Sequence, residues 1–204
     1  MKHGRNSQII PVIIIVIIVV VSVAAIVTVA RNLFFSGGNN TAQTEQQEDA
    51  DKKALLSTTA DRGVRMTVRG EITADEKFRS YQIVITPTKR TMTTYAGYLD
   101  SVIASASYEN NTRAYEEFVF ALDRAGMVEG EPLEGAKNDR RGLCSSGKIL
   151  EFETIQNDQP VEMLWTSTCR DASGSLKANS TQLGNLFTAQ IPASRDLLRT
   201  IRES

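Results

Sequence analysis

Two cysteines and a single histidine limit the chemistry that this chain can perform. Cys144 and Cys169 are the only cysteines, lie 25 positions apart and form no C-x-x-C pair. His3 is the only histidine, so the region from Asp61 onward contains no imidazole. This pattern suits neither a redox pair nor a zinc site, and it excludes Ser-His-Asp and Cys-His nucleophile systems from that region. We predict a structural disulfide between Cys144 and Cys169, no metal ligand and no cofactor.

Two further motifs fall in one short segment. Ser145-Ser146-Gly147-Lys148 matches the S-x-x-K pair of penicillin-recognising enzymes, but the S-D-N and K-T-G companions are absent. The run from Gly142 to Lys148 reads G-x-x-x-x-G-K, with Ile149 where a phosphate-binding loop needs Ser or Thr. We interpret both as loop and predict no catalytic residue and no bound nucleotide. A cell-wall or surface enzyme that uses carboxylates or Ser145/Lys148 is the alternative.

Paired carboxylates are the other candidates for acid–base chemistry. Glu116 and Glu117 are adjacent, and adjacent residues of a helix do not share a face. Glu151 and Glu153 share one face of an expected strand. We expect both pairs to lie on solvated faces.

An expected hairpin would bring the cysteines together. Residues 150–155 and 161–167 have strand composition, and residues 156–159 lie near the turn. One antiparallel register pairs the apolar residues and the cysteines on a single face: Phe152 with Val161, Leu150 with Met163, Lys148 with Trp165, and Cys144 with Cys169. In this register Glu151 and Glu153 lie on the face opposite Trp165.

Residues 9–30 contain no charge, and sixteen of these 22 residues are Ile or Val. A helix of this length spans about 33 Å, close to the thickness of the hydrocarbon core. The run is longer than the apolar core of a cleaved signal peptide, so we predict an uncleaved transmembrane helix, with cleavage after Ala30 left open. Lys2 and Arg5 precede it and Arg31 alone follows closely, which predicts a cytoplasmic N-terminus and an extracytoplasmic C-terminal domain.

The rest of the chain predicts a tether and one α+β domain. We expect a cytoplasmic N-terminus over residues 1–8, a polar tether over residues 31–61 and a folded domain over residues 62–204. A short helix at residues 42–56 is an alternative for part of the tether. Period-two patterns predict strands at residues 64–72 and 81–85. Residues 90–96 and 101–108 favour two strands over one helix, because they are rich in β-formers and Gly97 interrupts them.

Helices complete the predicted domain. Asn111 or Thr112 caps an amphipathic helix that ends at Gly126, and residues 127–142 read as a surface loop. Two short helices follow, one from Thr181 and one from Ser194, separated by Pro192. We predict an antiparallel β-sheet with one main helix packed across it, preceded by a single transmembrane helix.

The charge distribution and the aromatic residues limit which classes of partner we expect. From Asp61 onward the 18 basic and 20 acidic residues are nearly balanced and scattered, which gives no footprint for nucleic acid. Tyr95, Tyr98 and Trp165 are candidates for an interface, although such residues also form cross-strand pairs or core. The bilayer is the expected partner of residues 9–30, together with an envelope protein or a surface ligand.

Several short runs carry a resemblance to a known group of proteins. These runs are Gly97-Tyr98, Asn110-Asn111, Ala114-Tyr115, Trp165-Thr166-Ser167-Thr168-Cys169 and Leu186-Phe187-Thr188-Ala189-Gln190-Ile191-Pro192. Over residues 62–192 the chain resembles small, uncharacterised membrane-anchored envelope proteins of ultrasmall, host-associated bacteria of the Saccharibacteria type. The resemblance implies a bacterial cell envelope and carries no activity, cofactor or site residue.

A type IV pilin is a further alternative, because pilins combine an apolar N-terminal helix with a C-terminal cysteine pair. Pilins also need a Phe-like residue after a glycine cleavage site and a glutamate at the fifth mature position. After Gly4 this chain has Arg5, and Ile9 stands in the glutamate's place. The sequence therefore favours a membrane-anchored extracytoplasmic binding or structural module without catalysis. Its ligand and oligomeric state are not encoded in any motif.

Overall fold

The computed structural model describes residues 40–99 and 101–203. The chain divides into two compact units, and the second, Glu48–Ser204, contains the sheet. The elements in chain order are α2 (Asn40–Leu55), β1 (Arg62–Arg69), η1 (Asp75–Lys77), β2 (Arg79–Ile85), β3 (Lys89–Ala96), β4 (Ser101–Glu109), α3 (Thr112–Arg124), η2 (Gly135–Asn138), β5 (Ile149–Gln156), β6 (Gln159–Ser167), α4 (Ser180–Ala189) and α5 (Ser194–Glu203).

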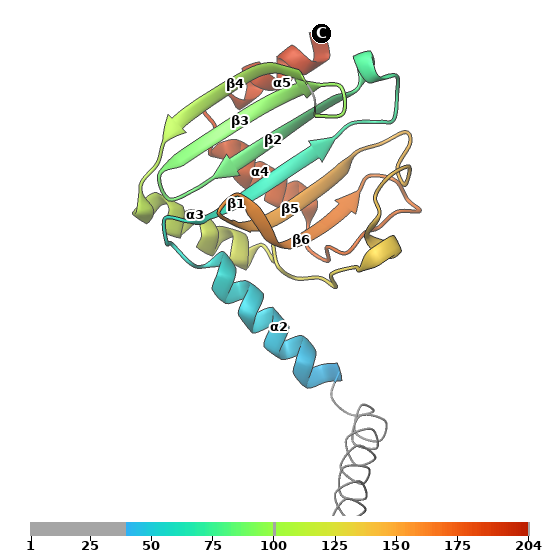
Figure 1. Ribbon diagram of the computed structural model, residues 1–204. Helices are drawn as coiled ribbons and strands as arrows, with labels where there is room; N and C mark the ends of the chain where they lie inside the picture. Colours follow the sequence, from blue (N-terminus) through green and yellow to red (C-terminus); the bar gives the residue numbers. More distant parts are fainter. Residues whose placement is uncertain (1–39, 100, 204) are drawn as a thin grey trace, which may run out of the picture. The chain divides into compact units, whose positions relative to one another are not determined.

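Six strands form one antiparallel sheet in the order β4-β3-β2-β1-β5-β6. The helices α3, α4 and α5 lie along one face of this sheet (Figure 1). The main core fills the space between them, with Met66, Phe152, Leu122 and Phe187 all buried. The α+β class and the antiparallel sheet are confirmed. Three helices share the apolar face because a six-stranded sheet is wider than one helix can cover.

The region from residue 90 to 108 forms two strands, as predicted. β3 and β4 pair antiparallel with a register shift between Thr94 and Tyr95. Gly97 and Leu99 in the connection have positive φ values of 67° and 76°. Positive φ values interrupt an α-helix. The apolar spacing in this region also fitted one helix, but the chain therefore forms two strands instead.

The amphipathic helix α3 begins where the capping residue predicts. The Asn111 side chain accepts a hydrogen bond from the Ala114 amide at 2.9 Å. Tyr115, Phe118 and Leu122 are buried against the sheet, and Gly126 follows with a φ of 74°. The predicted start, apolar stripe and glycine stop are therefore confirmed.

The polar stretch before the first strand contains a helix. Residues 40–55 are helical, and Leu55 is fully buried in the main core. Lys52 forms an ion pair with Asp123 of α3, with a nitrogen–oxygen distance of 2.8 Å. The compact unit Glu48–Ser204 therefore includes the end of α2, because one apolar residue and one ion pair fix this helix end to the sheet domain.

The predicted transmembrane helix at residues 9–30 lies outside the described residues, as does the N-terminal segment before it. Within the described part of the chain, no helix combines the length and the apolar composition needed to cross a membrane.

The hairpin of β5 and β6 forms, but the predicted register is wrong. Phe152 pairs with Leu164, and Glu151 pairs with Trp165. The turn contains only Asn157 and Asp158, with φ values of 51° and 63°. A two-residue turn with both residues left-handed sets the register locally, and a bulge between Thr154 and Ile155 shifts it by one. The strand faces are consequently exchanged relative to the prediction.

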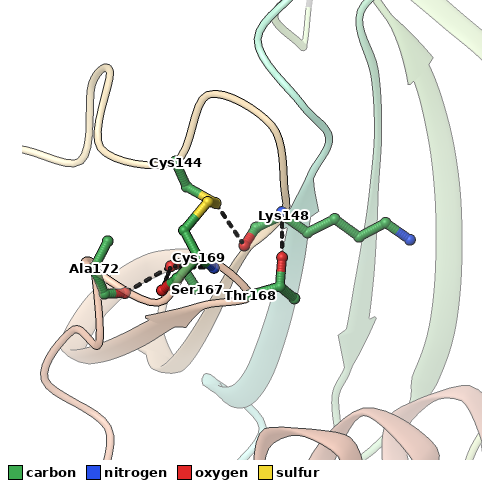
Figure 2. Close-up of a disulfide and its surroundings, with 6 residues drawn as sticks. All are labelled: Cys144, Lys148, Ser167, Thr168, Cys169 and Ala172. Carbon is green, nitrogen blue, oxygen red and sulfur yellow. Dashed lines mark hydrogen bonds between the residues drawn. A yellow bond between two sulfur atoms is a disulfide. The ribbon is translucent and has the colours of Figure 1, made fainter.

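The disulfide between Cys144 and Cys169 is present, as predicted, with Cα atoms 5.5 Å apart. Figure 2 shows that it joins the segment before β5 to the segment after β6. Thr168 reinforces this closure, since its amide donates to the Lys148 carbonyl at 2.9 Å. The cysteines meet because they lie just beyond the paired strand ends, where a shift of register is absorbed by loop residues.

Candidate functional site

The face of the sheet that α3, α4 and α5 do not cover carries polar side chains, and we call it the open face. Thr93 and Ser105 are 3.0 Å apart across β3 and β4, and the Gln82 amide donates to Thr67 at 3.1 Å across β2 and β1. These residues alternate with the core residues of the same strands. The open face is therefore a hydrogen-bonded polar surface that leads towards β5 and β6.

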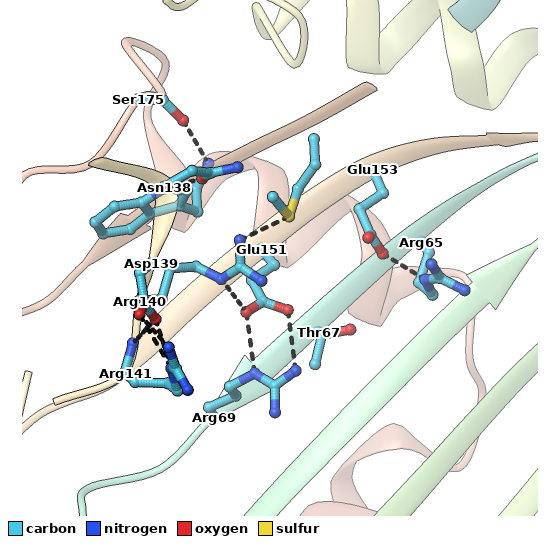
Figure 3. A network of polar contacts seen from close by, with 12 residues as sticks. Arg65, Thr67, Arg69, Asn138, Asp139, Arg140, Arg141, Glu151, Glu153 and Ser175 are labelled. Atoms are coloured by element: carbon cyan, nitrogen blue, oxygen red, sulfur yellow. Dashed lines mark hydrogen bonds and ion pairs between the residues drawn. The ribbon is translucent and has the colours of Figure 1, made fainter. Parts of the chain in front are cut away.

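Two buried carboxylates lie on this face. Glu151 is 3% exposed and Glu153 is 7% exposed. Figure 3 shows Arg69 and Arg140 reaching Glu151, and Arg65 beside Glu153. The Arg69 Nε and the Arg140 Nε lie 3.0 and 2.8 Å from the same Glu151 oxygen. The expectation of a solvated face is wrong for this pair, because arginines from the neighbouring strand and loop neutralise it.

The segment before β5 folds over this face and buries the tryptophan. The Trp165 indole nitrogen donates to Asn138 Oδ1 at 3.0 Å, and the Arg140 guanidinium approaches the Met163 sulfur at 3.1 Å. Trp165 is 2% exposed and packs with Cys144 and Ile149. Residues 127–142, predicted as a surface loop, therefore also form the lid of a second small core.

A cavity of about 620 Å³, the open-face cavity, lies between this loop and the end of β1. Its apolar wall is formed by Ile72, Phe78, Tyr98 and Ile149. Its polar wall contains Arg69, Arg140, Arg141, Asp139 and Glu151. Ile72 and Tyr98 are each 46% exposed. An apolar concave wall beside a few convergent polar groups is the usual composition of a small-ligand site.

The arginines of the cavity leave a surplus of positive charge. Glu151 neutralises only one of the two arginines that it binds, Arg69 and Arg140. Arg141 is paired with Asp139, and its guanidinium holds the pKa of that carboxyl at about 2. Each guanidinium has five N–H donors and uses only part of them in these contacts. The cavity can therefore donate several hydrogen bonds to an anionic or oxygen-rich group.

The structure separates the three aromatic residues predicted for an interface. Tyr98 lines the cavity, stacks on Phe78 with ring centroids 4.0 Å apart and donates from its hydroxyl to the Thr73 carbonyl. Tyr95 lies half-buried on the open face, opposite Ser80 and Val102. Trp165 is buried and therefore cannot offer its ring to a partner.

Ser145 and Lys148 do not form a nucleophile pair in this conformation. Both side chains are exposed, and no hydrogen bond joins them among the contacts of the described residues. The Ser145 carbonyl accepts from the Ile72 amide, and the Lys148 side chain extends away from the disulfide (Figure 2). Strand β5, not a helix, begins at Ile149, so the glycine-rich run does not adopt the fold of a nucleotide-binding loop.

The arginine–glutamate network was missed by sequence reasoning, although one signal for it was present. Arg65 and Arg69 alternate with the core residues of β1, and Glu151 and Glu153 alternate with those of β5. A two-residue turn at Asn157-Asp158 would by itself pair Leu150 with Trp165 and keep the predicted faces, so the exchange of faces comes from the bulge between Thr154 and Ile155, which no recognised pattern marks. The approach of Arg140 depends on the path of a long loop, which no local pattern encodes.

Comparison with known proteins gives no relative from which a role could be carried over. No protein-family model matches the chain, and no curated protein is significantly similar to it.

Proposed function

We propose that this protein is a membrane-anchored module of a bacterial cell envelope that binds a ligand or partner group in the open-face cavity, without catalysing a reaction. The observation that supports this proposal best is the cavity's composition. Two of the exposed apolar side chains, Ile72 and Tyr98, meet three arginines around one concavity. Exposed apolar surface costs solubility, so its concentration at a cavity favours a binding role.

The proposed ligand has an apolar or planar part and an oxygen-rich anionic part. The Phe78–Tyr98 stack and Ile72 would contact the apolar part, since the exposed Tyr98 ring offers a rigid flat surface. Arg69 and Arg140 would donate to the anionic part, because together they hold one more positive charge than Glu151 neutralises. A peptide carboxylate or an acidic sugar next to an apolar group has this chemistry.

The apolar run at residues 9–30 supports an anchored, extracytoplasmic placement, and the disulfide supports the same compartment, since disulfides persist outside reducing interiors. The resemblance to envelope proteins of Saccharibacteria-type bacteria agrees with this placement. We propose no catalytic role for the Ser145–Lys148 pair, because their side chains do not interact with each other.

Site-specific photocrosslinking tests the proposal. A benzophenone amino acid replaces Tyr98 in the full chain, and intact cells are irradiated. We expect a discrete adduct at Tyr98 that is reduced by Arg69→Gln, because that change removes donors from the same cavity. The matched control carries the crosslinker at Phe120 of α3, which is similarly exposed but lies outside the cavity. Adducts of equal yield at both positions, or at neither, would contradict the proposal.

A further inference from the structure

A second cavity, of about 490 Å³, also borders Gly70, and we call it the basic cavity. The charged side chains that line it are Lys77, Arg79, Lys148, Arg202 and Glu71. Four cations therefore face one carboxylate. This ratio contrasts with the region from Asp61 onward, where acidic residues slightly outnumber basic ones.

The cations of the basic cavity are less neutralised than those of the open-face cavity. In the open-face cavity every arginine forms an ion pair with Glu151 or Asp139. Lys77, Lys148 and Arg202 form no ion pair with any carboxylate of the described residues. Like charges gathered without counter-charges repel one another, so an anion placed among them is strongly favoured.

The disulfide fixes the position of Lys148. Its amide donates to Thr168 Oγ1 at 2.8 Å, and its carbonyl accepts from the Thr168 amide. A Cβ atom on Gly147 would lie 2.4 Å from Thr168 Oγ1 and 2.8 Å from the Cys144 sulfur, so only glycine fits there. Figure 2 shows the Lys148 side chain leaving this clamped turn on the side away from the sulfurs.

The other three cations come from separate elements. Lys77 ends η1, Arg79 begins β2, and Arg202 lies near the end of α5. The Arg79 guanidinium donates hydrogen bonds to the carbonyls of Glu76 and Phe78. Ser146 and Thr73 add hydroxyl groups to the lining. The tertiary fold therefore assembles donors that are remote in sequence around one space.

We propose that the basic cavity binds a phosphate group, supplied by an anionic lipid headgroup or by a soluble phosphate compound. Lys77, Lys148 and Arg202 carry two more positive charges than Glu71 neutralises, which suits a phosphate group with one or two negative charges. Lysine acts as a compact point charge that accepts any approach direction, as a tetrahedral anion requires. Part of the G-x-x-x-x-G-K run would thus bind phosphate through Lys148, although it is not a nucleotide-binding loop. The site does not depend on the ligand of the open-face cavity.

Titration calorimetry of the full chain in non-ionic detergent micelles tests this site with two probes. One probe is inorganic tripolyphosphate, and the other is a short-chain phosphatidylglycerol. We expect saturable one-to-one binding of at least one probe that weakens as NaCl is added. Lys148→Gln and Lys77→Gln should each lower the affinity about five-fold, as expected for losing one charge near 4 Å in water. Reduction of the disulfide should also lower the affinity, because the cross-link would no longer hold the turn that positions Lys148.

Matched variants distinguish binding at this site from a general effect of the protein's net charge. Lys89→Gln removes an exposed lysine at the opposite end of β2 and β3, and Arg195→Gln removes an exposed arginine from α5 itself. Both should keep the affinity within two-fold. Tyr98→Ser, which alters the open-face cavity, should also leave it unchanged and so distinguishes this site from the first.

Each outcome decides the proposal. Binding of tripolyphosphate alone, of the lipid alone or of both supports a phosphate site and identifies the source. If circular dichroism shows that Lys148→Gln is unfolded, Lys77→Gln on η1 carries the same comparison. Absence of saturable binding by both probes, or an equal loss of affinity in Lys89→Gln and Lys77→Gln, would overturn it.

Discussion

At the scale of single residues, Glu151 determines the charge balance of the open face. Its buried carboxylate accepts from arginines of two different segments, Arg69 of β1 and Arg140 of the loop before β5. It thereby fixes the loop that covers Trp165 and shapes the cavity. A buried charge of this kind is tolerated only while its partners remain in place.

Replacing Glu151 by Gln should destabilise the protein, because Arg69 and Arg140 would face each other without a counter-charge. Since both arginines are partly solvated, we expect a loss of about 1–3 kcal/mol. Glu116→Gln on the exposed side of α3 should change the stability by less than about 0.5 kcal/mol. Urea titration of the full chain in detergent micelles measures both, with the single tryptophan, Trp165, as the fluorescent probe. Equal midpoints for the two variants would rule out this role of Glu151.

Glu162 is a half-buried acid whose charge is coupled to that of Asp51 in α2. Burial, together with the negative charge of Asp51, raises the pKa of Glu162 to about 8. Its Oε2 atom and the hydroxyl of its cross-strand partner Thr154 are buried without a hydrogen-bond partner among the described residues. The carboxyl is therefore held in its neutral form near pH 7.

The stability of the protein should consequently fall as the pH rises from about 4.5 to about 8. Across this window the folded state holds a proton on Glu162 that the unfolded chain has released, so raising the pH favours unfolding. Thermal unfolding followed by circular dichroism should show this slope, and Glu162→Gln should flatten it. Asp51→Asn should flatten it less, and Glu117→Gln should not change it. A slope that survives in Glu162→Gln would assign the pH dependence to other groups.

The β5–β6 hairpin shows, at the scale of an element, how a short turn and a bulge together set the register of two strands. Asn157 and Asp158 both have left-handed backbone, which selects a two-residue connection. The bulge between Thr154 and Ile155 then shifts the pairing by one residue and places Glu151 and Glu153 on the same face as Trp165. The position of Trp165 relative to these glutamates thus depends on the turn and the bulge together.

Substitutions in this turn should change stability in opposite directions. Asp158→Gly suits the left-handed position and should stabilise the protein by about 0.5–1 kcal/mol. Asn157→Val forces a β-branched residue into the same region and should cost about 1–3 kcal/mol. Urea midpoints of the two variants provide the measurement. A gain of stability in Asn157→Val would mean that the turn does not constrain the hairpin.

Sequence patterns predicted the elements that depend on local signals. Period-two alternation marked β1 and β2, and Asn111 with Gly126 marked the limits of α3. The predicted register of β5 and β6 was wrong because apolar pairing was weighed above turn chemistry, and because the bulge between Thr154 and Ile155 was not anticipated. The open-face cavity was not predicted, because Arg69, Tyr98 and Arg140 come from distant segments and meet only in the tertiary fold.

The whole molecule combines one sheet, whose helix side forms the main core, with a loop and a disulfide on its other side. The disulfide closes a loop of 25 residues around β5 and β6. It therefore contributes to the small core of Trp165 and to the positioning of Lys148, and both candidate cavities depend on it.

Loss of the disulfide should weaken the whole domain. The Cys144→Ser, Cys169→Ser double variant should lose about 3 kcal/mol, the chain-entropy value for a loop of this size. Urea titration of this variant, compared with the oxidised protein, measures the loss. Indistinguishable midpoints would show that the cross-link adds no stability and that packing around Trp165 is sufficient.

The claim on which the functional account depends most is that the domain is displayed outside the cytoplasm. A Lys89→Cys variant tests it directly, because Lys89 is exposed at the end of the sheet remote from the cysteine pair. A membrane-impermeant maleimide is applied to sealed cells before and after lysis. The account predicts labelling of the introduced cysteine before lysis, with Cys144 and Cys169 unreactive in both samples. Labelling only after lysis, with the two native thiols free, would contradict it.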